Sequence, residues 1–189
     1  SDYNLTIEPN TEFAKFIPAN LPNDDLCYAM QDQIIHQLST HGFQRYETSA
    51  YAQKAHQAQH NLNYWQFGDY LGIGAGAHSK LSFHDKIIRQ SRHKHPQEYM
   101  KRILNQQQIL ENTVIQKSDL SLEFMMNALR LTNGFSNQLF SETTSLPFSQ
   151  ILPQLLRAQQ QGFLELTPTK IIPTEQGRDF LNNLLEIFM

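Results

Sequence analysis

Six consecutive residues, His60 to Trp65, combine side chains that suit a flat ligand containing a metal. They read His-Asn-Leu-Asn-Tyr-Trp and place one imidazole, two amides and two large aromatic rings within a short span. Imidazole is a natural ligand of iron, and aromatic faces can flank a flat macrocycle. On residue types alone, a histidine beside aromatic residues is more often a structural hydrogen-bonding group. Ligation by His60 is therefore one hypothesis, and a structural role is the other.

A glycine-rich segment follows, with Gly72, Gly74 and Gly76 leading to His78. Glycines at this spacing let a backbone approach a ligand closely or turn tightly at the end of a strand. The segment lacks the Gly-Lys-Ser/Thr ending of a phosphate-binding loop and the full GxGxxG pattern of dinucleotide sites. A tight turn is the favoured interpretation.

The elements that must hold these residues are predicted from hydrophobic periodicity. Residues 1–52 have the pattern of a parallel βαβ unit. Apolar residues alternate over residues 3–7, which predicts a short strand, and recur at every fourth position over residues 23–42, which predicts a helix. Residues 43–52 are typical of a second strand, and residues 60–79 of a last strand with its loop.

The second half of the chain changes to short helices. The expected order is a helix that Ser121 caps, one that Ser136 caps, one that Ser145 and Pro147 open, a hairpin over residues 163–172, and a closing helix that Thr174 caps. Three helices, a hairpin and a helix are the order of a winged-helix module.

Composition places the chain of 189 residues among globular proteins, with 40% hydrophobic and 17% charged residues. Its one cysteine, Cys27, excludes internal disulfides and an iron–sulfur cluster built from this chain alone. The first ten residues lack the basic and apolar regions of a signal peptide, and no apolar run is long enough for a membrane helix. We therefore expect a cytoplasmic protein.

Charge is distributed unevenly along the chain. Residues 80–118 carry eight basic and three acidic side chains, net +5, whereas residues 119–189 carry four and seven, net -3. The basic segment, which includes His84, His93 and His95, is either an anion-facing strip or, as we favour, a solvated helix face and linker. In a winged-helix protein the third helix would contact the bases of DNA, and here that helix, opened by Ser145 and Pro147, has Arg157 as its only basic residue. No nucleic-acid binding is therefore expected, and a winged-helix nucleic-acid module is the least favoured function.

Several longer strings resemble a known family. YNLTIEPNT, YETSAYA, HNLNYWQFGDYLGIGAGAH, SLEFMMNALRLTNG, LLRAQQQGFLEL and PTEQGRDFLNNLL occur in this order. Together they resemble the C-terminal half of the HemW family of radical SAM proteins, which are related to oxygen-independent coproporphyrinogen III oxidase. The resemblance covers nearly the whole chain, and implies that the chain is a fragment of a longer parent.

The resemblance implies an α+β fold. Residues 1–80 would be the C-terminal strands and helices of a partial (β/α) radical SAM barrel. Residues 81–118 would be a basic linker with helical character, and residues 119–189 a helical, winged-helix-like domain. The cysteine triad that holds the family's [4Fe–4S] cluster would lie in the barrel half of the parent, so cluster and S-adenosylmethionine belong to the full-length parent only.

The function that the resemblance implies is haem binding and delivery to respiratory enzymes. The alternative is an oxidase-type enzyme of porphyrin biosynthesis, so enzymatic activity stays open. The family's HNxxYW motif falls on His60, Asn61, Tyr64 and Trp65, with His60 as candidate axial ligand of haem iron and the two aromatic residues as packing or orienting groups. Peripheral contact with a membrane and oligomer formation stay open.

By similarity to the oxidase, contacts to S-adenosylmethionine would fall near Thr6 and His78. The sequence departs from the family at Ala50, where asparagine is common, and at Ser79, where glycine is common. The first departure puts in doubt a polar contact from that position, and the second stiffens the turn.

Overall fold

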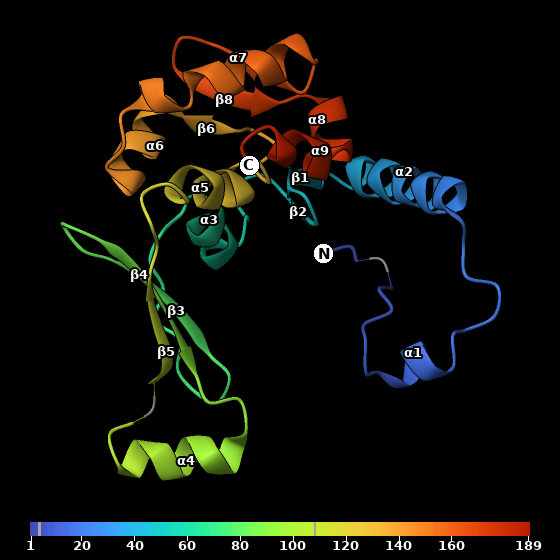
Figure 1. The fold of residues 1–189 in the computed structure, drawn as a ribbon. Helices are drawn as coiled ribbons and strands as arrows, with labels where there is room; N and C mark the ends of the chain where they lie inside the picture. Colours follow the sequence, from blue (N-terminus) through green and yellow to red (C-terminus); the bar gives the residue numbers. More distant parts are fainter. Residues whose placement is uncertain (4, 108) are drawn as a thin grey trace. The chain divides into compact units, whose positions relative to one another are not determined.

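The computed structural model describes residues 1–3, 5–107 and 109–189. The chain forms two compact units, Ser1–Ala58 and Gln59–Met189, and each is described by itself. The chain is α+β, with helices and antiparallel strands (Figure 1). The division into three domains at residues 80 and 118, and the assignment of residues 1–80 to a partial barrel, stay predictions.

The first unit contains a long helix and a small hairpin. Its elements are α1 (Glu12–Lys15), α2 (Asp24–Thr40), β1 (Gln44–Glu47) and β2 (Ala50–Ala52). The predicted helix is confirmed as α2, and the side chain of Asn23 accepts a hydrogen bond from the backbone of Leu26 at 2.9 Å. This bond satisfies one of the free N–H groups of the first turn, which explains where the helix begins.

The predicted parallel βαβ arrangement is wrong for this unit. Strands β1 and β2 pair antiparallel, because the chain reverses at Thr48, whose carbonyl accepts two hydrogen bonds from the Arg45 guanidinium at 2.7 and 3.1 Å. No strand forms over residues 3 and 5–7, and Asn4 of the predicted strand lies outside the described residues. A β-strand forms only where consecutive residues make backbone hydrogen bonds to a neighbouring strand.

The second unit begins with α3 (Gln59–Trp65) and a three-stranded antiparallel sheet. The strands are β3 (His78–Ser82), β4 (Ile87–Arg92) and β5 (Ile109–Val114), in the order β3-β4-β5, and α4 (Pro96–Leu104) connects the last two. In Figure 1, α4 lies at the end of this sheet away from α5. The expectation of a strand over the His60 segment is therefore wrong, and the segment expected to be a helical linker holds two strands besides its helix.

The rest of this unit follows the predicted order of helices and hairpin. Its elements are α5 (Leu120–Ala128), β6 (Phe135–Ser136), α6 (Asn137–Thr144), the 3-10 turn η1 (Phe148–Gln150), α7 (Leu152–Gln160), β7 (Leu164–Leu166), β8 (Lys170–Pro173), α8 (Glu175–Asp179) and α9 (Leu181–Glu186). Ser136 and Thr174 cap α6 and α8 as predicted. Ser121 does not cap α5, which begins one residue earlier, after Asp119. The winged-helix description stays a prediction.

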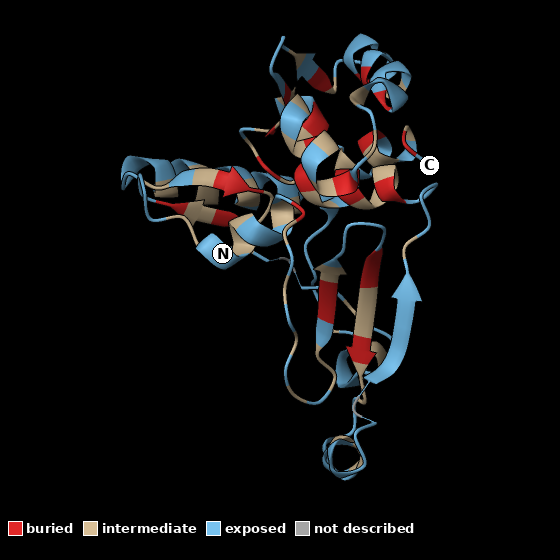
Figure 2. Cartoon of the chain, turned by 90° about the vertical axis from the view of Figure 1, so that its left-hand side faces the viewer, coloured by how far each residue is buried: buried red, intermediate tan, exposed pale blue. Residues whose placement is uncertain are grey.

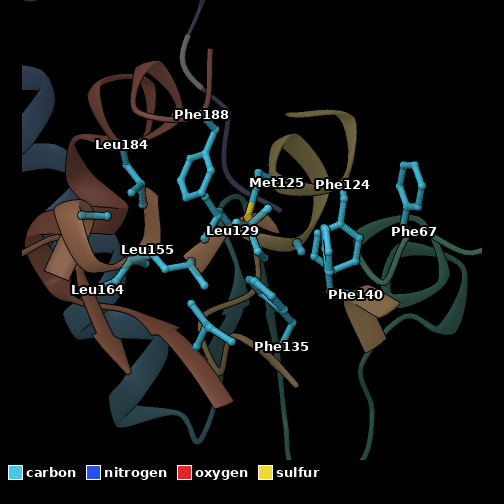
Figure 3. Packing of buried hydrophobic residues seen from close by; sticks show 14 of the residues in the cluster. Phe67, Phe124, Met125, Leu129, Phe135, Phe140, Leu155, Leu164, Leu184 and Phe188 are labelled. Atoms are coloured by element: carbon cyan, nitrogen blue, oxygen red, sulfur yellow. The ribbon is translucent and has the colours of Figure 1, made fainter. Parts of the chain in front are cut away.

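Aromatic rings form the centre of the second unit's core. Phe124 of α5 is fully buried, and its ring meets those of Phe67, Phe135 and Phe140 edge-on at centroid distances of 5.7, 5.0 and 5.2 Å (Figure 3). Edge-to-face pairs at such distances add to the stabilisation from burial. Buried residues concentrate on α5 and around it, whereas β5 is exposed along its length (Figure 2). No helix in the described parts of the chain is long and apolar enough to cross a membrane.

Candidate functional site

Helix α3 presents the candidate iron ligand and an aromatic ring on one side. His60 and Tyr64 are four residues apart, the spacing that places two side chains one above the other on a helix. Their ring centroids lie 6.5 Å apart with nearly perpendicular planes. His60 is exposed, and Tyr64 keeps 37% of its surface exposed. The helix therefore offers an accessible imidazole beside an accessible aromatic ring.

A second tyrosine links this helix to the sheet. The rings of Tyr64 and Tyr70 meet edge-on at 4.6 Å. The backbone of Tyr70 is paired with that of Lys80 in β3, with two N–H···O bonds of 3.0 Å. Because Tyr70 is fixed to a strand, it limits the positions that Tyr64 can adopt. The row His60, Tyr64, Tyr70 is an aromatic face supported by the sheet.

Trp65 anchors the same helix to α5. The guanidinium of Arg130, just after α5, lies 4.3 Å from the centroid of the indole ring. Such cation–π contacts are worth about 0.5–2 kcal/mol, depending on burial. The indole Nε1 is buried and has no hydrogen-bond partner in the described residues. Trp65 thus packs toward α5 while His60 and Tyr64 face solvent, which fits an orienting role.

A buried lysine supports the turn after α3, and sequence reasoning missed it. Lys80 is 2% exposed, and its Nζ lies 4.1 Å above the ring of Phe67. It donates to the carbonyl of Phe67 at 2.9 Å, to Oδ1 of Asp69 at 3.1 Å and to Oγ of Ser82 at 3.2 Å. Nothing in the sequence separates this lysine from its basic neighbours, because its burial depends on the pairing of β3 with residue 70.

The charges of this cluster have shifted pKa values. Burial lowers the pKa of Lys80 against the opposing attraction of Asp69. For Asp69, burial acts to raise the pKa, but hydrogen bonds from the backbone and hydroxyl of Ser82 and from Lys80 outweigh it, and the pKa is lowered. The cluster therefore fixes the turn by charge-assisted hydrogen bonds.

The glycine-rich segment is a turn packed against the sheet, as favoured from sequence. A Cβ on Gly72 would lie 2.1 Å from the carbonyl oxygen of His78, so only glycine fits. The N–H of Gly72 donates to Ser79 Oγ at 2.9 Å. Gly74 and Gly76 have positive φ angles of 105° and 72°, and the N–H of Gly74 donates to the hydroxyl of Tyr99 at 3.2 Å. The backbone N–H groups of Gly72 and Gly74, which could otherwise bind a phosphate, are therefore already used in hydrogen bonds within the protein.

The structure brings some of the predicted site residues together and separates others. His60, Tyr64 and Trp65 share α3, as does the half-buried Asn61. His78 is exposed at the start of β3, and Thr6 is exposed in the other unit, so their predicted contact with S-adenosylmethionine stays a prediction. Among the described residues, no group of three or more His, Cys, Asp or Glu side chains is placed to hold a metal ion. Haem needs only an axial ligand from the protein.

Comparison with known sequences identifies relatives over the whole chain. Residues 115–180 match the family model described as the HemN C-terminal domain. The chain is 44% identical to the heme chaperone HemW of Escherichia coli (strain K12) over 189 residues, and 44% identical to the heme chaperone HemW of Haemophilus influenzae over 188. Each alignment covers 99% of this chain and 48% of the relative. The chain thus spans about half the length of the curated relatives it matches.

A eukaryotic relative and a solved structure extend this result. The chain is 33% identical to the radical S-adenosyl methionine domain-containing protein 1, mitochondrial, of Dictyostelium discoideum, over 97% of this chain and 48% of that protein. The fold is similar to that of coproporphyrinogen III oxidase (HemN) from Escherichia coli, described as a radical SAM enzyme. The TM-score is 0.64 at 16% identity, over 90% of this chain and 42% of that one. Over nearly its whole length the chain is thus similar to about half of proteins named heme chaperone HemW, and its residues 115–180 match the HemN C-terminal domain.

Proposed function

We propose that this chain supplies a haem-binding face to a haem chaperone, with His60 as axial ligand of the haem iron. The observation that carries the proposal is the exposed imidazole of His60 beside the exposed ring of Tyr64 on α3. The naming of relatives at 44% identity as heme chaperones supports the same conclusion. The proposal extends to a cytoplasmic location and to respiratory proteins as haem acceptors.

The arrangement of α3 suits transient binding of a cargo. A neutral imidazole donates a nitrogen lone pair to iron, and a single exposed ligand can be exchanged for one on an acceptor protein. Tyr64 offers a flat apolar surface for the macrocycle, and Tyr70 limits its movement. Trp65 holds the helix against Arg130, so the two exposed side chains keep their spacing.

Titration of haemin into the chain tests this proposal, followed by the Soret absorption band. We compare the unchanged chain with His60→Ala and with the control His84→Ala, which removes an exposed histidine of the same unit. Circular dichroism checks that all three fold alike. We expect saturable binding that is lost in His60→Ala and kept in His84→Ala. Equal binding by all three proteins contradicts the assignment of His60.

The alternative proposal is a porphyrinogen-oxidising role for the full-length protein, and the likeness to the HemN fold favours it. In that case Thr6 and His78 would contact S-adenosylmethionine, and a [4Fe–4S] cluster would have to be held outside this chain, which has only Cys27. Turnover of S-adenosylmethionine with decarboxylation of a porphyrinogen by the full-length protein supports this alternative. Haem binding without turnover supports the chaperone.

A further inference from the structure

Helix α4 presents an exposed apolar face at the end of the β3-β4-β5 sheet. Its inner side carries Tyr99, whose hydroxyl accepts a hydrogen bond from the backbone of Gly74. Its outer side carries Met100 and Leu104, which are 58% and 85% exposed, and Ile103 lies at the margin. Large apolar side chains on the outer face of a helix are not explained by packing within the unit.

The glycine-rich turn adds to this face. Ile73 is 82% exposed, and the neighbouring Gly74 is bonded to Tyr99, so the turn lies against α4. The backbone N–H of Gly76 donates to the carbonyl of His93, just before the helix. We call residues 71–76 together with residues 93–104, which include α4, the sheet tip. It carries exposed aliphatic side chains from two separate segments held together by hydrogen bonds.

Basic side chains surround these aliphatic residues. Lys94 and Lys101 are exposed, and Lys94 lies beside Gly76, whose added Cβ would be 3.7 Å from the Lys94 Cα. Arg102 pairs with Glu98 at 2.6 Å, with side chains that are 42% and 39% exposed, and Lys101 adds a further exposed positive charge. Residues 94–104 carry Lys94, Lys101 and Arg102 against Glu98, a net charge of +2. Charge and apolar surface therefore coincide at the sheet tip.

We propose that the sheet tip binds the surface of an anionic lipid bilayer, with the outer face of α4 in the interface. A basic amphipathic helix lies in the plane of the interface, with aliphatic side chains among the acyl chains and lysines at the headgroups. A nucleic-acid surface would match the lysines but not the exposed Leu104, Met100 and Ile73. This inference goes beyond the haem proposal and needs no haem.

Vesicle co-sedimentation of the 189-residue chain tests the proposal. The probes are vesicles of phosphatidylglycerol and phosphatidylcholine in equal parts, and vesicles of phosphatidylcholine alone. One double variant, Met100→Ser with Leu104→Ser, removes apolar surface, and another, Lys94→Gln with Lys101→Gln, removes charge. The control, Leu152→Ser with Leu156→Ser, removes two exposed leucines of α7. All changes are at exposed positions, and circular dichroism verifies the fold.

We expect the unchanged chain and the α7 control to bind anionic vesicles and to bind neutral vesicles far more weakly. Loss of two lysines should weaken binding about 25-fold, since each basic side chain near an anionic surface contributes about fivefold. Loss of the aliphatic pair should weaken binding at least about tenfold. Failure of the unchanged chain to bind anionic vesicles overturns the proposal, as does equal binding by the sheet-tip variants. Neither result bears on His60, which haemin titration tests separately.

Discussion

Replacing Asp69 with asparagine should destabilise the second unit, because it removes the charge that faces the buried Lys80. Lys80 is 2% exposed, so its ammonium group cannot regain water without opening the turn. Removing one partner of a fully buried ion pair costs about 3–5 kcal/mol. Here the Asp69 side chain is 43% exposed, and Lys80 keeps the Phe67 carbonyl and the Ser82 hydroxyl as acceptors. With this solvent screening we expect a loss of about 2 kcal/mol.

The loss of stability in Asp69→Asn should be greater at neutral pH than in acid. Folding lowers the pKa of Asp69 below its ordinary value of 3.8, so the carboxylate stabilises the fold above that value. As the pH falls below 3.8, Asp69 takes up a proton in the unfolded chain before it does so in the folded chain, and the stabilisation shrinks. It is lost once the pH has also fallen through the pKa of Asp69 in the folded state. The difference between the unchanged chain and Asp69→Asn should therefore be large at neutral pH and shrink in acid.

Urea unfolding followed by circular dichroism measures both effects, at neutral pH and at about pH 3. The control is Asp85→Asn, which changes an exposed carboxyl in the turn between β3 and β4. We expect the control to unfold like the unchanged chain. A loss in Asp69→Asn no greater than that of the control, or one that is equally large in acid, would refute the reasoning about the cluster.

Four further substitutions have expected outcomes that thermal or urea unfolding can check. Gly72→Ala should lower the free energy of unfolding by about 2 kcal/mol or more, because the new Cβ would lie 2.1 Å from a backbone carbonyl oxygen. Gly74→Ala should lower it by only about 1 kcal/mol, because its Cβ would point into open space and only the positive φ angle is unfavourable. Phe124→Ala should cost about 3–5 kcal/mol, since it removes a fully buried ring that contacts three others. Thr174→Ala should cost about 1 kcal/mol, because its Oγ accepts the Gly177 N–H at 2.9 Å, and equal stability would contradict this cap.

The features that could be predicted from sequence depend on neighbouring residues. The beginnings of α2, α6 and α8 follow from Asn23, Ser136 and Thr174, whose side chains bond to N–H groups three residues later. The hairpin β7-β8 follows from a turn between two apolar runs. Such signals act within a few residues, so a single sequence contains them in full.

The features that could not be predicted depend on residues far apart in the chain. Residues 59–65 form a helix although they are rich in aromatic and amide side chains, and the cation–π contact of Trp65 with the distant Arg130 helps to hold it. Periodicity over so short a segment does not separate helix from strand. The burial of Lys80 likewise requires the pairing of β3 with Tyr70. The candidate residue His60 was predictable from its motif, but its exposed pairing with Tyr64 was not.

The most direct test of the central claim is the electron paramagnetic resonance spectrum of ferric haem bound to the unchanged chain and to His60→Ala. If His60 is the axial ligand, the unchanged chain should give a spectrum typical of nitrogen ligation, and the variant should lose it under conditions where both proteins remain folded. The same nitrogen-ligated spectrum in His60→Ala would contradict the account, since another residue would then hold the iron.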